Sequence, residues 1–160
     1  MKLRPIAPYA GIVLAALIID QIVKRLVEAS LPLHEPVDIL PFLALYHSRN
    51  TGVAFSMLSG VEGPWLSLLV LVILVVVVVL AFKTESAQLY SRLGFALIVG
   101  GALGNLVDRG TLGYVVDYIY FHTPVWSFAI FNLADVFITI GAGLVILDEV
   151  LAWRRAPARD

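Results

Sequence analysis

Four long apolar segments, separated by polar connections, predict four membrane-spanning helices. The apolar segments cover residues 6–27, 64–82, 90–107 and 128–150. Each is close to the roughly 20 residues that an α-helix needs to cross a hydrocarbon layer about 30 Å thick. The first segment follows two basic residues, as in a signal peptide, but no small-residue cleavage site follows it. We therefore expect a retained helix and a single membrane-embedded domain over residues 1–160.

The second and third apolar segments differ in their expected packing. Residues 64–82 are almost entirely aliphatic or aromatic and include five consecutive valines from Val75 to Val79, so this helix is expected to face lipid. The third segment contains Gly100 and Gly104. This small-xxx-small spacing predicts a close approach to a neighbouring helix.

The connection between the first two spans predicts a small β-sheet. Its prolines argue against a continuous helix: Pro32, Pro36 and Pro41. Phe42–Tyr46 and Val53–Met57 are rich in strand-forming residues and flank Ser48–Gly52, which has the composition of a turn. The expected fold class is therefore an all-α membrane bundle of four helices, with a small extracytoplasmic sheet between the first and second helices.

The distribution of basic residues predicts the orientation of the bundle. With four spans, one side holds Lys2, Arg4, Lys83, Arg92, Arg154, Arg155 and Arg159, whereas the other holds Lys24, Arg25, Arg49 and Arg109. Because cytoplasmic loops carry the excess of Lys and Arg, both termini are expected in the cytoplasm. The long connections 28–63 and 108–127 then face outward.

Composition narrows the possible functions. Of the 160 residues 60% are hydrophobic and only 14% are charged, which excludes an ordinary water-soluble fold. The net charge of −1 indicates no basic track for nucleic acid. The chain has no cysteine, which removes disulfides, thiolate nucleophiles and thiolate metal sites. Any strong partner is expected to be lipidic or apolar.

Ionisable residues near the ends of the spans require an explanation, since a charge at the centre of a membrane helix costs about 2.5–3.5 kcal/mol on insertion scales. Asp20 and Lys24 stand four residues apart with the acid first, which favours an ion pair within the first helix. In the third helix Asn105, Asp108 and Arg109 share a face. Arg109 could extend toward the interface or anchor a carboxylate or a lipid phosphate.

Two further acids lie close to the outer boundary. Asp135 belongs to a polar stripe with Asn132 and Thr139 on the fourth helix, and Asp117 is the centre of an apolar segment in the preceding connection. Two carboxyl groups about 3 Å apart cannot both ionise easily, so one can keep its proton while the other activates water, as in an aspartic protease. The alternatives are a proton or ion relay, or buried acids balanced by Lys24 or Arg109.

Other protease chemistries match the sequence poorly. Met57-Leu58-Ser59-Gly60 lacks the first glycine of the Gly-x-Ser-Gly motif of a serine intramembrane protease. His34-Glu35-Pro36-Val37-Asp38 has an aspartate where the zinc motif H-E-x-x-H needs its second histidine, and a proline interrupts it. The acids therefore remain the main candidates for catalysis.

Five motifs together resemble bacterial lipoprotein signal peptidase (signal peptidase II). In chain order they are Asp20-Gln21-Ile22-Val23-Lys24, Asn50-Thr51-Gly52-Val53-Ala54-Phe55-Ser56, Gly104-Asn105-Leu106-Val107-Asp108-Arg109, Val115-Val116-Asp117-Tyr118 and Phe131-Asn132-Leu133-Ala134-Asp135. One departure is Val53, where the family usually has alanine. The resemblance implies a four-helix inner-membrane aspartic endopeptidase that removes signal peptides from prolipoproteins, cutting before a cysteine that carries diacylglycerol.

The resemblance also implies roles for individual residues. Asp117 and Asp135 match the catalytic dyad, without either being identifiable as the acid or the base. Positions that hold the substrate or support the dyad are matched by Asn50, Gly52, Asn105, Arg109 and Asn132. Asp20 and Lys24 match a pair that supports the fold, and the outer sheet matches the family's cradle.

The same resemblance implies an active site near the periplasmic face and no metal or cofactor. The implied partners are prolipoprotein substrates that carry a diacylglyceryl cysteine, and membrane lipids. The rival function is a small proton-coupled transporter or channel subunit, which predicts acids spread across the depth of the membrane. Here the acids Asp20, Asp117 and Asp135 are expected together at the outer end.

Overall fold

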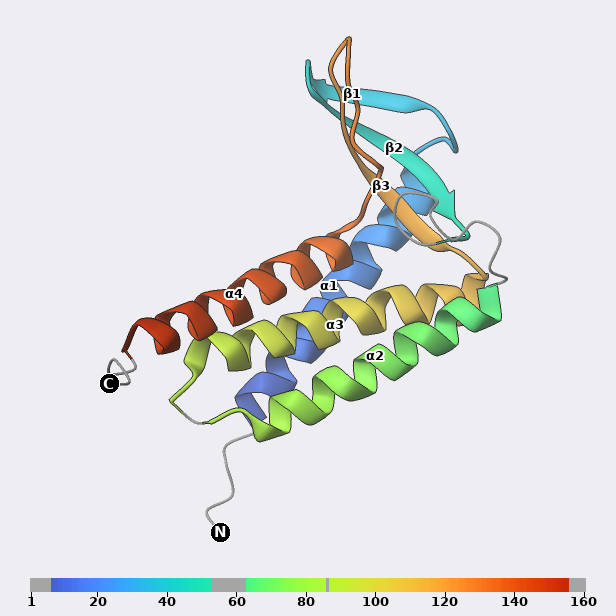
Figure 1. The fold of residues 1–160 in the computed structure, drawn as a ribbon. Coiled ribbons are helices and arrows are strands. Elements are labelled where there is room, and N and C mark those ends of the chain that lie inside the picture. Colours follow the sequence, from blue (N-terminus) through green and yellow to red (C-terminus); the bar gives the residue numbers. More distant parts are fainter. Residues whose placement is uncertain (1–6, 53–62, 86, 156–160) are drawn as a thin grey trace.

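The computed structural model describes residues 7–52, 63–85 and 87–155, and within them four long helices lie side by side (Figure 1). The helices are α1 (Ala7–Ser30), α2 (Gly63–Lys83), α3 (Leu89–Leu112) and α4 (Leu133–Arg155). Helix α3 contacts each of the other three helices, and its packing with α4 is the most extensive. The third helix is thus the centre of the bundle.

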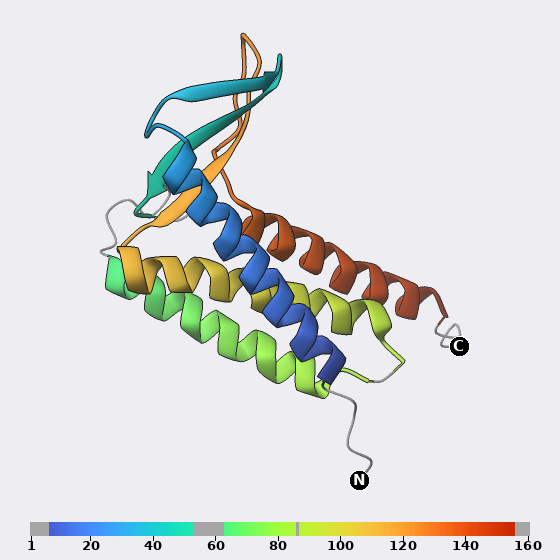
Figure 2. The ribbon, with the colours of Figure 1, turned by 180° about the vertical axis from the view of Figure 1, so that it is seen from behind.

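A three-stranded antiparallel sheet caps one end of the bundle. Its strands are β1 (Pro36–Leu40), β2 (Leu43–Asn50) and β3 (Val115–Phe121), in the order β1-β2-β3. The first turn of α1 and the last turn of α4 lie at the opposite end of the bundle (Figure 2). A mainly helical fold with a small sheet was predicted correctly.

The predicted location and composition of the sheet were partly wrong. The whole sheet was expected between the first and second helices, but β3 comes from the connection between α3 and α4. Ser48, Arg49 and Asn50 do not form a turn but continue β2, where they pair with Asp117, Val116 and Val115 of β3. The turn instead follows β1, before Leu43. The long-range pairing satisfies backbone groups that a local reading of the sequence assigned to a loop. The other predicted strand, Val53–Met57, lies outside the described residues.

Helix α4 begins at Leu133, five residues later than the expected start at 128. The segment before it is extended and pairs with β3: the Phe128 N–H donates to the Phe121 carbonyl at 2.8 Å, and Ile119 and Phe131 exchange hydrogen bonds of 2.7 and 3.1 Å. A short apolar run can form either a strand or a helix, and here hydrogen bonds to β3 keep the run extended.

Glycines allow the helices to approach closely, as the sequence predicted for Gly100 and Gly104. A Cβ on Gly100 would lie 2.7 Å from the Ala16 Cβ of α1, and one on Gly104 would collide with the Asp20 carboxylate. On another side of α3, a Cβ on Gly94 would collide with the carbonyl oxygen of Gly141 in α4. Close contact of α3 with both α1 and α4 therefore depends on glycine.

Two helices in the described part of the chain, Leu89–Leu112 and 133–154, are long and apolar enough to cross a membrane. The apolar stretch of α2, Ser67–Lys83, is shorter. Its valines Val72, Val75 and Val76 are more than half exposed, which is the surface expected of a helix that faces lipid. Length and composition thus support two of the four expected spans, and the other two remain a prediction.

We expect Gly94→Ala to lower the melting temperature of the protein, because the added methyl group would force the α3 and α4 backbones apart. Overpacking of this kind typically costs about 1–3 kcal/mol. Gly110→Ala is the matched control, since a Cβ there has nothing within 4 Å. Thermal unfolding in detergent checks both variants, and an unchanged melting temperature for Gly94→Ala would contradict the packing described for α3 and α4.

Candidate active site

A buried ion-pair cluster joins α1 to α3. The Lys24 Nζ lies 2.9 Å from the Asp20 Oδ2 and 2.8 Å from the Asp108 Oδ2. The three side chains are at most 3% exposed, so each charge is withdrawn from water and depends on its partners. The predicted pair of Asp20 and Lys24 is present, and Asp108 is an additional member.

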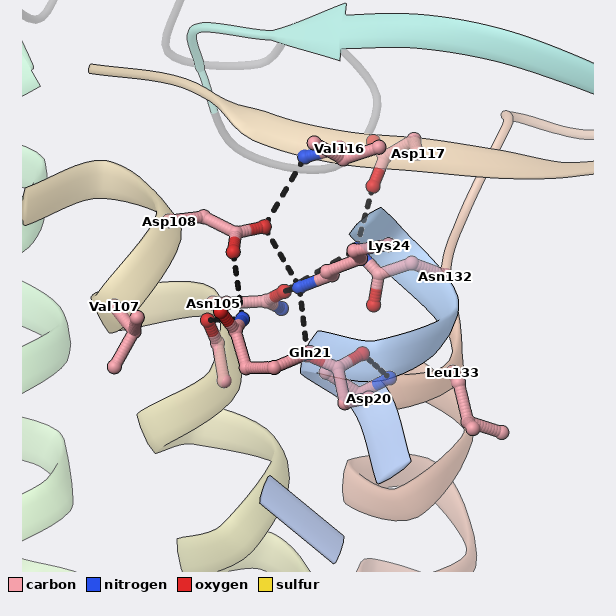
Figure 3. A network of polar contacts seen from close by, with 12 residues as sticks. Asp20, Gln21, Lys24, Asn105, Val107, Asp108, Val116, Asp117, Asn132 and Leu133 are labelled. Carbon is pink, nitrogen blue, oxygen red and sulfur yellow. Dashed lines mark hydrogen bonds and ion pairs between the residues drawn. The ribbon is translucent and has the colours of Figure 1, made fainter. Parts of the chain in front are cut away.

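The two carboxylates of this cluster also bind the backbone of other elements (Figure 3). The Asp108 Oδ2 accepts the Val116 N–H of β3 at 3.2 Å, while its Oδ1 accepts the Gln21 amide at 2.7 Å. The Asp20 Oδ1 accepts the Ala134 N–H at the start of α4 at 2.9 Å. The cluster therefore fixes β3 and α4 relative to α1 and α3.

Two asparagine side chains lead from the cluster to the acids. The Lys24 Nζ donates to the Asn105 Oδ1 at 2.8 Å, and the Asn132 Nδ2 donates to the same oxygen at 3.2 Å. The Asn105 Nδ2 in turn donates to the Asp135 Oδ1 at 2.9 Å. The Lys24 ammonium, the asparagine amides and the Asp135 carboxylate thus form one continuous chain of hydrogen bonds.

Asp135 is held by a capping box at the start of α4. The Asn132 Oδ1 accepts the Asp135 N–H at 3.1 Å, and the Asp135 Oδ2 accepts the Asn132 N–H at 3.2 Å. This reciprocal pair satisfies donors that a helix start leaves free. It also places a carboxylate in the first turn, where the positive end of the helix dipole favours negative charge.

Asp117 receives two amide donors and is almost completely buried in β3. Asn132 donates to its Oδ1 at 2.6 Å and Asn50 donates to its Oδ2 at 2.8 Å. Burial raises the pKa of the Asp117 carboxyl to about 7, the negative charge of Asp135 adds to this increase, and the two amide donors oppose it. A proton can therefore reside on Asp117 near neutral pH.

Arg109 lies beside the same site, at the end of α3. Its Nη2 donates to the Gly52 carbonyl oxygen at 3.0 Å, and the Gly52 N–H donates to the Asn50 Oδ1 at 3.0 Å. The guanidinium thus binds the backbone two residues after the end of β2. Arg109 is held next to the acids rather than extended away from them.

The two acids line one cavity of about 540 Å³. Asn50, Asn105 and Arg109 also reach its surface, and the rest of the lining is mostly apolar. The apolar lining comes from α2, α3, α4 and the segment before α4, and includes Val70, Ala102, Phe128, Phe131, Val136, Ile138 and Ile140. The cavity thus combines two carboxyl groups with a long apolar wall.

All nine residues predicted for the site are connected by hydrogen bonds or ion pairs in the structure. They are Asp20, Lys24, Asn50, Gly52, Asn105, Arg109, Asp117, Asn132 and Asp135. Sequence reasoning did not assign Asp108 and Gln21 to the site, although both lie within the quoted motifs. In the described part of the chain, no three His, Cys, Asp or Glu side chains are grouped to hold a metal ion.

Comparison with known families identifies the group to which this site belongs. The family described as signal peptidase II matches residues 12–151, nearly the whole chain. The chain belongs to the signal peptidase II family. The predicted class of enzyme, a signal peptidase of the aspartic type, is thereby confirmed at the level of the family.

Individual signal peptidases and solved structures agree with this assignment. The chain is 53% identical to a protein named lipoprotein signal peptidase from Mesorhizobium japonicum, over 98% of this chain and 93% of the relative. It is 51% identical to a lipoprotein signal peptidase of Brucella ovis, over 97% of each chain. A solved structure described as a bacterial membrane enzyme is 27% identical, has a TM-score of 0.78 and matches 98% of this chain and 95% of its own. Together these similarities indicate a membrane-embedded bacterial protein.

We expect Asp117→Asn to stabilise the protein relative to wild type increasingly as the pH rises from 4 to 7. The pKa of the folded carboxyl is raised from 3.8 to about 7, so stability that is present at low pH is lost as the pH rises toward 7. Each unit of the shift corresponds to about 1.4 kcal/mol. The asparagine never ionises and avoids this loss.

The measurement is the difference in melting temperature between variant and wild type across this pH range. Any hydrogen bond that the amide fails to reproduce shifts the difference equally at every pH. Glu35→Gln is the control, because the Glu35 side chain is exposed. If the difference in melting temperature between Asp117→Asn and wild type changed with pH as little as that of the control, the buried state of Asp117 would be contradicted.

Proposed function

We propose that this protein removes signal peptides from prolipoproteins, cutting before a diacylglyceryl-modified cysteine, with Asp117 and Asp135 as its catalytic dyad. The observation that carries the proposal is that both carboxyl groups line the same largely apolar cavity. Membership of the signal peptidase II family and the names of the relatives support the reaction. The cavity supplies carboxyl groups for hydrolysis and apolar walls for a lipidated substrate.

In the proposed reaction Asp117 begins protonated and Asp135 begins ionised. Burial keeps the proton on Asp117, whereas the capping box and the start of α4 favour the negative charge on Asp135. Asp135 takes a proton from water, and the resulting hydroxide attacks the scissile carbonyl carbon while the Asp117 hydroxyl polarises its oxygen. The C–N bond then breaks, Asp117 gives its proton to the leaving amine, and the dyad retains the proton taken from water.

Polar groups around the dyad are proposed to hold the main chain of the substrate. Asn50 and Asn105 reach the cavity and bind one acid each, so their positions are coupled to the dyad. Arg109 presents a cation at the same surface and can donate to a substrate carbonyl. Gly52, held between Asn50 and Arg109, aligns these groups.

The proposed environment is the bacterial inner membrane, crossed by four helices, with both termini in the cytoplasm and the dyad near the outer face. The sheet, the start of α4 and the end of α3 all lie at one end of the bundle (Figure 1). Lys83 is the last residue of α2, Arg92 lies in the first turn of α3 and Arg154 lies in the last turn of α4, so all three lie at the other end. That distribution favours this orientation. A lipidated substrate would then enter sideways from the bilayer.

The spacing of acids argues against the rival transporter. In α4 no acid lies between Asp135 and Asp148, a separation of about 20 Å along a helix. The Asp148 carboxylate at the far end accepts the Ser91 N–H at 2.9 Å and thereby links α4 to the start of α3. A chain of acids across the membrane is therefore missing from α4.

Prolipoprotein processing in a bacterium that lacks its own lipoprotein signal peptidase tests the function. We expect wild type and Asp38→Asn to restore processing, and Asp117→Asn and Asp135→Asn to abolish it, because each removes one carboxyl group of the dyad. Immunoblots for the precursor and the mature lipoprotein measure the outcome, with protein levels checked in the membrane fraction. Normal processing by either dyad variant would refute the dyad, and a precursor left uncut by wild type would refute the function.

We expect the kcat of the purified enzyme to fall as the pH rises above about 7, since Asp117 must hold a proton to polarise the scissile carbonyl. Rates on a peptide with a diacylglyceryl cysteine, measured from pH 5 to 9, give this profile. Asp38→Asn should keep the wild-type profile. A kcat that continues to rise through pH 9 would place the required proton elsewhere.

A further inference from the structure

We propose that Lys24 is a positioning residue for the dyad: it fixes the orientation of the Asn105 amide and thereby the position of the Asp135 carboxylate. The inference rests on the proposed dyad and goes beyond the expectation that Lys24 only supports the fold. Lys24 is absent from the cavity lining, so it would act through Asn105 rather than on the substrate.

Lys24 makes three polar contacts. An ammonium group carries three N–H bonds and no acceptor. The Lys24 Nζ forms ion pairs with the Asp20 Oδ2 at 2.9 Å and the Asp108 Oδ2 at 2.8 Å, and it donates a hydrogen bond to the Asn105 Oδ1 at 2.8 Å. The carboxylates of Asp20 and Asp108 are enough to balance the positive charge of Lys24. Its hydrogen bond to Asn105 is therefore not needed to neutralise that charge.

The bond to Asn105 selects one of the two orientations of its amide. Because Lys24 can only donate, it must face the amide oxygen, and the Asn132 Nδ2 faces the same oxygen. The Asn105 nitrogen is then directed at the Asp135 Oδ1, 2.9 Å away. A flipped amide would place its NH2 group against two donors and its oxygen against a carboxylate.

The same cluster also reaches the other acid. The Asp108 Oδ2 forms an ion pair with the Lys24 ammonium and accepts a hydrogen bond from the Val116 N–H, and Val116 immediately precedes Asp117 in β3. The cluster therefore sets the strand that carries one acid and the amide that binds the other (Figure 3). Placement of reacting groups is a large part of catalysis, and an error of about 1 Å can cost roughly a hundredfold in rate.

A double-mutant cycle tests the proposal. The first variant is Asp20→Asn/Lys24→Met, which removes one negative and one positive charge and so leaves the net charge of the cluster unchanged. We expect kcat to fall about tenfold to a hundredfold, with KM within about twofold of wild type, on the diacylglyceryl peptide substrate. In an Asn105→Ala background the same pair of changes should lower kcat by less than about threefold, because the amide through which Lys24 acts is gone.

Asp148→Ala is the control for a purely structural effect. It removes the link between α4 and the start of α3 at the far end of the bundle, and should lower the melting temperature without changing kcat. An unchanged kcat in the Asp20→Asn/Lys24→Met variant would overturn the proposal. Equal losses of kcat with and without Asn105 would also overturn it, since a general structural defect gives additive effects.

If the Asp20→Asn/Lys24→Met variant does not fold, Lys24→Arg tests whether Lys24 positions the dyad. The charge is retained, but a planar guanidinium cannot reproduce the three contacts of the ammonium. We expect reduced kcat and the same dependence on Asn105. Failure of both variants to fold would assign Lys24 to folding alone and overturn the proposal. Failure of the dyad would appear separately, as activity retained in Asp117→Asn or Asp135→Asn.

Discussion

The arrangement of this protein depends on one buried cation between two buried carboxylates. The Lys24 ammonium cannot be left without partners in an apolar interior, and neither can Asp20 or Asp108. Because Lys24 and Asp20 belong to α1 and Asp108 to α3, satisfying the charges holds these helices at a fixed separation. Replacing a buried ion pair with apolar residues often costs no stability, so such a cluster is better explained by the geometry that it imposes.

Between this charged cluster and the cavity lie neutral amide groups, followed by the two acids. The ions contact the neutral amide of Asn105, which together with Asn132 contacts the acids. Amides can pass on orientation without adding charge, because each has a donor and an acceptor in a fixed plane. The acids are thereby held firmly while the nearest full positive charge of the cluster stays out of the cavity lining.

The two acids are equivalent in chemistry but not in structural setting. Asp135 lies in the first turn of a helix and takes part in its capping box, whereas Asp117 lies in a strand and is enclosed by side-chain amides. A helix start stabilises negative charge and burial opposes it, and burial raises the pKa of the Asp117 carboxyl. The strand and the helix therefore give two identical side chains different electrostatic surroundings.

The sequence by itself determined a mainly helical fold with a small sheet, and it indicated nine candidate residues for the site. Long apolar runs, the Asp20–Lys24 spacing and the family motifs are all local or additive signals, and the nine site residues that they indicated are connected in the structure. Only the tertiary structure decided that Ser48–Asn50 extend a strand, that α4 starts at Leu133, and that Asp108 joins the ion pair. Each of these depends on a partner distant in sequence: an unpaired strand edge or a buried charge selects among local conformations that the residues themselves leave nearly equal in energy.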